Sequence, residues 1–159
     1  DVGTISSLWE ANMEVLDPEH SGINLFDENW KIYSRNSGMT GHKIGSNAVV
    51  ENCMITDGCR IDGNVKHSIL FSGVKVEKGA KVEDAVVMGG TVIKAGAVVE
   101  HCIVAENVVI GENAIVGSMP KDEGHGVATI GSGITIGKGA KIGPNAMVNK
   151  NVEDGEEQW

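Results

Sequence analysis

A repeat of 17 residues restricts this chain to one kind of architecture. Between Leu70 and Val116 an aliphatic residue begins each short block, and the steps between these residues run six, six and five before the pattern repeats. We call these residues openers: Leu70, Val76, Val82, Val87, Ile93, Val99, Val104, Ile110 and Val116. An internal period of this size indicates a solenoid, in which each repeat stacks on the one before it.

A second regularity marks the corners of that solenoid. In twelve six-residue blocks, from the one that begins at Ile44 to the one that begins at Ile142, the fourth residue is always glycine or asparagine: Asn47, Gly58, Asn64, Gly73, Gly79, Gly90, Gly96, Asn107, Asn113, Gly133, Gly139 and Asn145. Glycine and asparagine tolerate positive φ, so a corner is expected at this place in each block. The fifth residue is small or branched and shares the interior with the opener.

Three such blocks make one triangular coil, and stacked coils bury the openers in a central column. The spacing therefore predicts an all-β fold of short parallel strands over residues 44–148. Spacing alone does not give the hand of the solenoid, because ordinary parallel crossovers are right-handed. The pattern resembles that of hexapeptide-repeat proteins, and this resemblance implies a left-handed parallel β-helix.

The segment 1–43 has a different character. Thr4 is a candidate N-cap, Ser7 and Glu10 fit a capping box, and apolar residues at helical spacing continue to Leu16, before Asp17-Pro18 ends the helix. This short helix must lie on the end of the β-helix, on another domain, or on both, because it cannot bury its apolar stripe alone.

An irregular linker follows this helix as far as residue 43. Its alternation predicts a short strand over Trp30–Tyr33, and the aromatic residues from Phe26 to Tyr33 are expected to plug the mouth of the solenoid. Residues 117–129 interrupt the repeat as a loop. The acidic tail at 149–159 is expected to fray.

Composition excludes several classes of partner. The net charge of -9, with no basic patch, argues against nucleic acid and anionic membranes. No apolar run is long enough to span a bilayer, and no signal-peptide pattern begins the sequence. The three cysteines lack metal-ligand spacing, so reduced thiols and a cytoplasmic location are expected.

Three segments resemble the bacterial glucose-1-phosphate adenylyltransferases (ADP-glucose pyrophosphorylases). The first is Asp-Val-Gly-Thr-Ile-Ser-Ser-Leu-Trp-Glu-Ala-Asn-Met at 1–13, which is similar to the junction after that family's catalytic domain. The others are Trp-Lys-Ile-Tyr-Ser at 30–34 and His-Ser-Ile-Leu-Phe at 67–71. The resemblance implies a nucleotidyltransferase of glycogen biosynthesis, which converts ATP and glucose 1-phosphate to ADP-glucose and pyrophosphate.

The same resemblance implies which part of the enzyme this chain represents. Nucleotidyl transfer needs a glycine-rich phosphate loop, basic residues and carboxylates that hold Mg²⁺, and the sequence has no Gly-x-Gly-Thr-Arg-Leu-type loop. The chain is therefore expected to be the regulatory and oligomerisation domain, inactive by itself and without a cofactor of its own. Its expected partners are an N-terminal catalytic domain, like or related subunits in a tetramer, and a small-molecule effector.

The resemblance also suggests candidate site residues. Asp1 resembles a metal-holding carboxylate of the family, but one carboxylate cannot complete an octahedral Mg²⁺ site, so we expect Asp1 to be disordered rather than metal-bound in this chain. Gly58, Arg60 and Gly63, in a coil near the junction, are the candidates for effector contacts.

The five-residue blocks predict a further feature along one edge of the coils. Their third residues, Asn52, His67, Asp84 and His101, should stack as a polar ladder with about 4.8 Å between rungs. Such a column could hold a cation, or an anionic effector at low pH, although a solvated polar edge is the simpler interpretation.

The alternative function is that of a hexapeptide acyltransferase, which shares the fold and uses a histidine between the subunits of a trimer. The loop at 117–129 with His101 or His125 would supply its parts. Fold alone does not choose between the two functions. The segment 1–13 favours the adenylyltransferase, because an acyltransferase has no reason to carry it.

Overall fold

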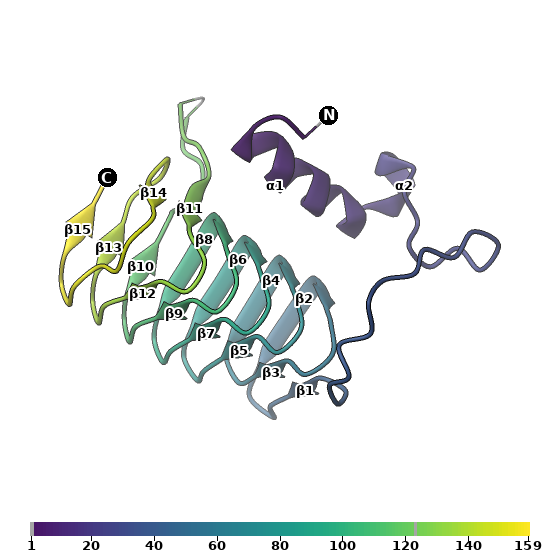
Figure 1. The fold of residues 1–159 in the computed structure, drawn as a ribbon, viewed down its shortest axis with the longest axis horizontal. Helices are drawn as coiled ribbons and strands as arrows, with labels where there is room; N and C mark the ends of the chain where they lie inside the picture. Colours follow the sequence, from purple (N-terminus) through teal and green to yellow (C-terminus); the bar gives the residue numbers. More distant parts are fainter. Residues whose placement is uncertain (1, 123) are drawn as a thin grey trace.

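The computed structural model, which describes residues 2–122 and 124–159, is a parallel β-solenoid with one helix along its side (Figure 1). The helical part consists of α1 (Ile5–Met13), the 3-10 turn η1 (Glu14–Leu16) and α2 (Pro18–Ser21). The strands are β1 (Lys43–Ile44), β2 (Val49–Ile55), β3 (Arg60–Ile61), β4 (Asn64–Leu70), β5 (Lys75–Val76), β6 (Lys81–Val87), β7 (Val92–Ile93), β8 (Val98–Val104), β9 (Val109–Ile110), β10 (Ile115–Val116), β11 (Ala128–Ile130), β12 (Thr135–Ile136), β13 (Lys141–Ile142), β14 (Met147–Val148) and β15 (Glu157–Gln158).

The strands form two sheets in which every described pair is parallel. One sheet has the order β1-β3-β5-β7-β9-β12, and the other runs β15-β13-β10-β8-β6-β4-β2, with β11 between β8 and β14. Val82 pairs with Val99 and Val87 with Val104, so neighbouring strands are offset by the 17-residue period of the sequence. The predicted stacking of coils is confirmed.

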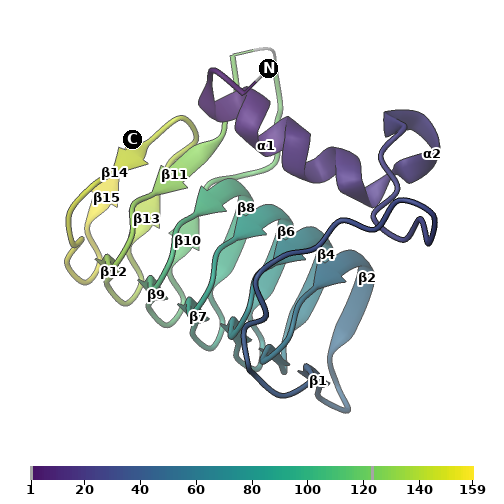
Figure 2. The same ribbon diagram turned by 45° about the vertical axis from the view of Figure 1, so that its right-hand side comes forward.

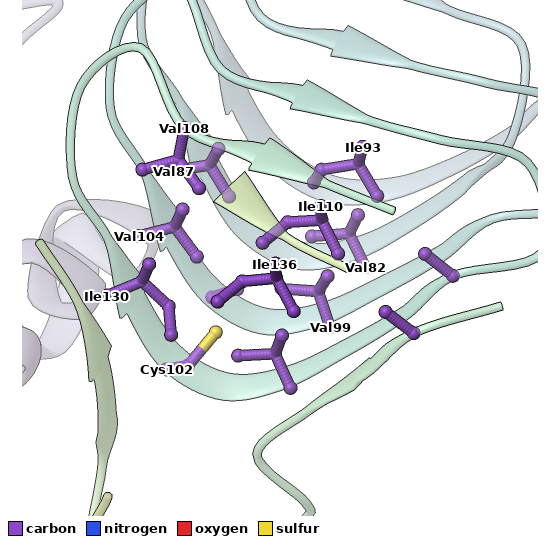
Figure 3. Packing of buried hydrophobic residues seen from close by; sticks show 14 of the residues in the cluster. Val82, Val87, Ile93, Val99, Cys102, Val104, Val108, Ile110, Ile130 and Ile136 are labelled. Carbon is purple, nitrogen blue, oxygen red and sulfur yellow. The ribbon is translucent and has the colours of Figure 1, made fainter. Parts of the chain in front are cut away.

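The openers form the core. All nine from Leu70 to Val116 are at most 1% exposed, and Figure 3 shows several of them one above another between the walls of the coils. Ile44, the opener of the first coil, is 45% exposed because no earlier coil covers it. Burial of an opener therefore depends on having a coil on both sides.

The corners follow the glycine and asparagine positions at ten of the twelve blocks, where φ is positive. Asn47 and Asn64 are not among the residues with positive φ, so the prediction is wrong at these two. At Asn64 the reason lies in the length of the turn. Ile61 pairs with Val76 and Val65 with Val82, which leaves this turn two residues shorter than its neighbour and makes Asn64 the first residue of β4.

Helix α1 lies along the side of the solenoid and does not close its end (Figure 2). Met13 packs with Val86, Ile103 and Val127 in a second small core, joined by Ile5, Leu8, Trp9 and Leu16 from the helical segment. Thr4 is the N-cap as predicted, but the capping box pairs Thr4 with Ser7 and not Ser7 with Glu10. The apolar stripe thus has a partner within this chain.

Two expectations for the linker are wrong. No strand forms at Trp30–Tyr33, and Phe26, Trp30 and Tyr33 are 78%, 77% and 84% exposed, so they plug nothing. Met39 is the apolar linker residue that meets the solenoid, where its side chain lies against the corners at Gly58 and Gly73.

The tail is ordered, contrary to expectation. Val152 is 2% exposed and bridges to Ile136, and β15 pairs with β13. The solenoid therefore continues through 149–159, because these residues cover the openers of the last regular blocks.

The fold predicts how stability is divided between openers and corners. Replacing Ile93 with Ala should lower the free energy of unfolding by about 2 to 5 kcal/mol, because it leaves a cavity in a narrow core. Replacing Asn107, where φ is 56°, with Ala should cost about 1 kcal/mol through backbone strain. Urea unfolding measures both, with Ile44→Ala as the control that should cost less than Ile93→Ala. The reverse ranking of Ile93 and Asn107 would contradict the assignment of inside and corner.

Candidate functional site

Three of the four residues predicted to form the polar ladder are bonded to one another. Asp84 lies between two histidines: its Oδ1 is 2.7 Å from His67 Nδ1, and its Oδ2 is 2.8 Å from His101 Nδ1. Asn52 occupies the same place in the preceding coil but is exposed, and no side-chain hydrogen bond is found for it in the described part of the chain. The polar ladder is from here on His67, Asp84 and His101.

The chemistry of the carboxylate fixes the protons of both rings. An ionised carboxylate only accepts hydrogen bonds, so each Nδ1 carries a hydrogen and donates it to Asp84. The bonds to Asp84 use only Nδ1 of each ring, and Nε2 takes no part in them.

The backbone of the ladder is unusual. His67, Asp84 and His101 have φ of 40°, 58° and 44°, in the left-handed region that residues other than glycine adopt infrequently, with asparagine, aspartate and histidine the commonest among them. These residues form the third corner of each coil, which the glycine pattern did not reveal. Non-glycine residues in this region persist only where their surroundings hold them, and they often mark functional sites.

Helix α1 covers the ladder through Trp9. The indole Nε1–H donates to the backbone carbonyl of Asp84 at 2.9 Å, and the indole meets the His101 ring edge-on at 4.6 Å between centroids. His101 is only 7% exposed as a result. The contact joins residues 75 positions apart, and periodicity within the repeat gave no signal for it.

The loop at 117–129 closes the other side of this site. The His125 ring lies 6.3 Å from that of His101, and its Nε2 is 2.7 Å from the Ser118 carbonyl oxygen, to which it donates. Val127 packs into the same apolar cluster as Met13 of α1. The site is thus built from the solenoid, the helix and the loop together.

Lys81 and two glutamates flank the ladder. The Lys81 ammonium lies 2.8 Å from a carboxylate oxygen of Glu83 and 2.8 Å from one of Glu100. Hydrogen bonds from the two carboxylates, that of Glu100 first, raise the pKa of Lys81 above its ordinary value. This side chain therefore stays charged and balances part of the acidic surface beside the ladder.

No group of three histidine, cysteine, aspartate or glutamate side chains suited to a metal occurs in residues 2–122 and 124–159. In the ladder, both Nδ1 atoms already donate to Asp84. Asp1, the carboxylate that the family resemblance singles out, lies outside the described residues.

Of the effector candidates, two glycines have structural reasons to be glycine. Gly58 has φ of 75° beneath Met39, and a Cβ at Gly63 would come within 2.5 Å of the Ala80 carbonyl oxygen. Arg60 is exposed and pairs with Asp62 at 3.1 Å. It borders a hollow of about 400 Å³, which the short turn after Ile61 opens between neighbouring coils and which is lined by Gly45, Ser46, Asn47, Arg60, Asp62, Glu77, Lys78 and Ala95.

A second hollow was not anticipated from the sequence. It measures about 380 Å³ and lies between the linker and the first corners, lined by Ser34, Arg35, Asn36, Ser37, Thr56, Asp57 and Ser72. The run of four polar residues after Tyr33 was the only sequence signal for it. Unlike the hollow at Arg60, it combines an arginine with several hydroxyl groups.

Comparison with known proteins places the solenoid in a family. A family model described as "GlmU-like, C-terminal hexapeptide" matches residues 37–137. The chain belongs to this hexapeptide family. Membership confirms the left-handed parallel β-helix that the sequence pattern suggested, and it covers the coils that carry the ladder.

Named relatives add a second likeness. Proteins called glucose-1-phosphate adenylyltransferase from Bacillus mycoides (strain KBAB4) and Bacillus cereus (strain ATCC 10987) are each 54% identical to this chain over 79 residues. The match covers 50% of this chain and 21% of each relative, so the chain matches about a fifth of the length of these proteins. The resemblance to adenylyltransferases noted in the sequence is confirmed.

The two alternative candidates for an acyltransferase histidine, His101 and His125, both form hydrogen bonds within this hexapeptide domain. His101 donates to Asp84 and lies beneath Trp9, and His125 donates to Ser118 within its own loop. Helix α1 covers His101 through the indole of Trp9.

No helix in the described ranges is long and apolar enough to cross a membrane.

The thiol of Cys102 lies at the centre of the hexapeptide core (Figure 3). Burial, aided by the charges of Asp84 and Glu100, raises its pKa above the ordinary value of 9.0. Burial also raises the pKa values of Cys53 and Cys59. In the folded chain these thiols therefore keep their protons in alkali where the unfolded chain loses them.

This difference predicts the pH dependence of stability. Above about pH 9 the unfolded chain binds fewer protons than the folded chain, so the free energy of unfolding should fall as the pH rises. Urea unfolding under reducing conditions between about pH 8 and about pH 10 measures the fall. Cys102→Ala should show a shallower fall than the wild type, and equal slopes would contradict the assigned role of Cys102.

Proposed function

We propose that this chain is the β-helix domain of a glucose-1-phosphate adenylyltransferase, the enzyme that makes ADP-glucose and pyrophosphate from ATP and glucose 1-phosphate. The observation that carries the proposal is the 54% identity over 79 residues to proteins of that name. The segment at 1–13 also supports it, because its sequence resembles the junction that follows the catalytic domain in this family.

In this proposal the chemistry belongs to a catalytic domain that precedes Asp1. Nucleotidyl transfer depends on groups that neutralise the phosphates and hold Mg²⁺ at the reacting centre. Mg²⁺ does not fit the described residues, which offer no suitable ligand cluster, and Asp1 alone could supply one ligand of an octahedral site. The β-helix contributes no step of the reaction.

The role we assign to the β-helix is regulation and assembly. Its flat parallel faces and its ends are regular surfaces on which a catalytic domain or further subunits can pack. Arg60 beside its hollow is available for an anionic effector, although Asp62 competes for its charge. The polar hollow at Arg35 lies on the linker side, nearer in sequence to the junction.

The engaged histidines weigh against the acyltransferase alternative. A catalytic histidine must reach the hydroxyl or amine that it deprotonates. The bond to Asp84 uses only Nδ1 of His101, so it is the indole of Trp9, packed against the ring, that hinders an acceptor from reaching this histidine.

The direct test is to measure ADP-glucose formation by the 159-residue chain and by the protein with its upstream coding region restored. The longer protein should form ADP-glucose from ATP and glucose 1-phosphate with Mg²⁺, and the 159-residue chain should form none. Synthesis by the short chain would contradict the assignment of chemistry to a preceding domain. A longer protein that is folded but inactive would contradict the proposed function.

A further inference from the structure

The polar ladder makes contacts that the solenoid does not need for its own core. The openers already give the solenoid a continuous core, and the ladder lies outside that core on the corner beneath α1. Its residues nevertheless adopt a strained backbone, and a glycine at each corner would relieve that strain. At His67, Asp84 and His101 the side chains make hydrogen bonds that glycine could not make.

These side chains form the surface on which Trp9 packs, and we call this surface the seat of Trp9. His67 and His101 hold the Asp84 carboxylate from both sides, which fixes the Asp84 backbone with its carbonyl directed at the indole N–H. His101 in turn presents its ring to the indole at 4.6 Å. In the described part of the chain, the hydrogen bond and the ring contact of Trp9 are both with the ladder, and its apolar contacts are with the cluster around Met13.

Helix α1 depends on this seat more than most helices would. It has nine residues, and helices this short are marginal in water without a partner surface. The linker after α2 is largely exposed and irregular as far as Lys43, so it tethers the helix without fixing its position. The position of α1 is therefore set by its side-chain contacts alone.

We propose that the polar ladder is the positioning device by which the β-helix fixes helix α1, and through α1 the domain that precedes it. Only eight positions separate Trp9 from Asp1, the residue at which the resemblance places the end of the catalytic domain. A rigid seat for Trp9 thus transmits the position of the β-helix to the catalytic domain. This second step rests on the proposed function, whereas the seating of α1 does not.

The first part of the test is amide hydrogen exchange on the 159-residue chain. His101→Asn removes the ring beneath Trp9 while asparagine tolerates the positive φ, so the corner itself is preserved. Amides of α1 should exchange at least tenfold faster, while those of β6 and β8 stay protected. His42→Asn is the control: it makes the same change at an exposed linker residue outside the ladder and should alter α1 exchange less than twofold.

A second variant tests the same contact from the side of α1, without a change in the solenoid. Trp9→Phe lies outside the solenoid, keeps one aromatic ring, and removes the indole N–H that donates to the Asp84 carbonyl together with part of the ring surface. It should also speed exchange in α1 and leave the coils unchanged. Unchanged exchange in α1 for both variants would overturn the proposal, because the apolar contacts of Met13 and its neighbours would then hold the helix by themselves.

The second part of the test uses the protein with its upstream region restored. His101→Asn should lower kcat for ADP-glucose synthesis about tenfold and leave the KM for glucose 1-phosphate unchanged, because the seat positions the catalytic domain without touching substrate. His42→Asn, outside the ladder, should stay within twofold of the wild type. Faster exchange in α1 with an unchanged kcat would overturn the transmission of position. If the wild-type protein made no ADP-glucose, the proposed function would fail, and the exchange result would still decide whether the ladder seats α1.

Discussion

The stacking of aliphatic openers in register is the constraint on which the rest of the structure depends. Each opener lies over the one 17 residues earlier, so the walls of the solenoid can approach closely and exclude water. Where a neighbouring coil is missing, as beneath Ile44, the same kind of residue becomes exposed. The corners, the sheet order and the ordered tail all follow from keeping this column covered.

The sequence was sufficient to predict the column and most of its corners because both depend on local chemistry. Branched aliphatic residues at fixed spacing are buried together when the coils stack in register. Glycine and asparagine tolerate the positive φ of the corners. Asn64 departs from the rule because the turn after Ile61 is two residues short, and local propensity cannot override chain length. The aromatic linker residues were misassigned because hydrophobicity alone does not show that a surface is available to receive them.

The candidate site was predictable only in part, because local spacing determines some of its contacts and not others. Equal spacing within the five-residue blocks placed His67, Asp84 and His101 one above another, as the structure confirms. The contact with Trp9 links elements 75 residues apart and depends on how a tethered helix lies on the solenoid. Periodicity describes the solenoid but contains no information about what covers its side. The hollow beside Arg35 was missed because it too forms between the linker and the coils.

The measurement that most directly tests the assignment of this β-helix to an adenylyltransferase is the mass of the purified chain by light scattering, combined with a titration of acyl-CoA. Hexapeptide acyltransferases place their active sites between three adjacent subunits, so such a chain would be a stable trimer. The account predicts a dimer, a tetramer or a mixture that depends on concentration, with no affinity for acyl-CoA. A stable trimer that binds acyl-CoA would contradict it.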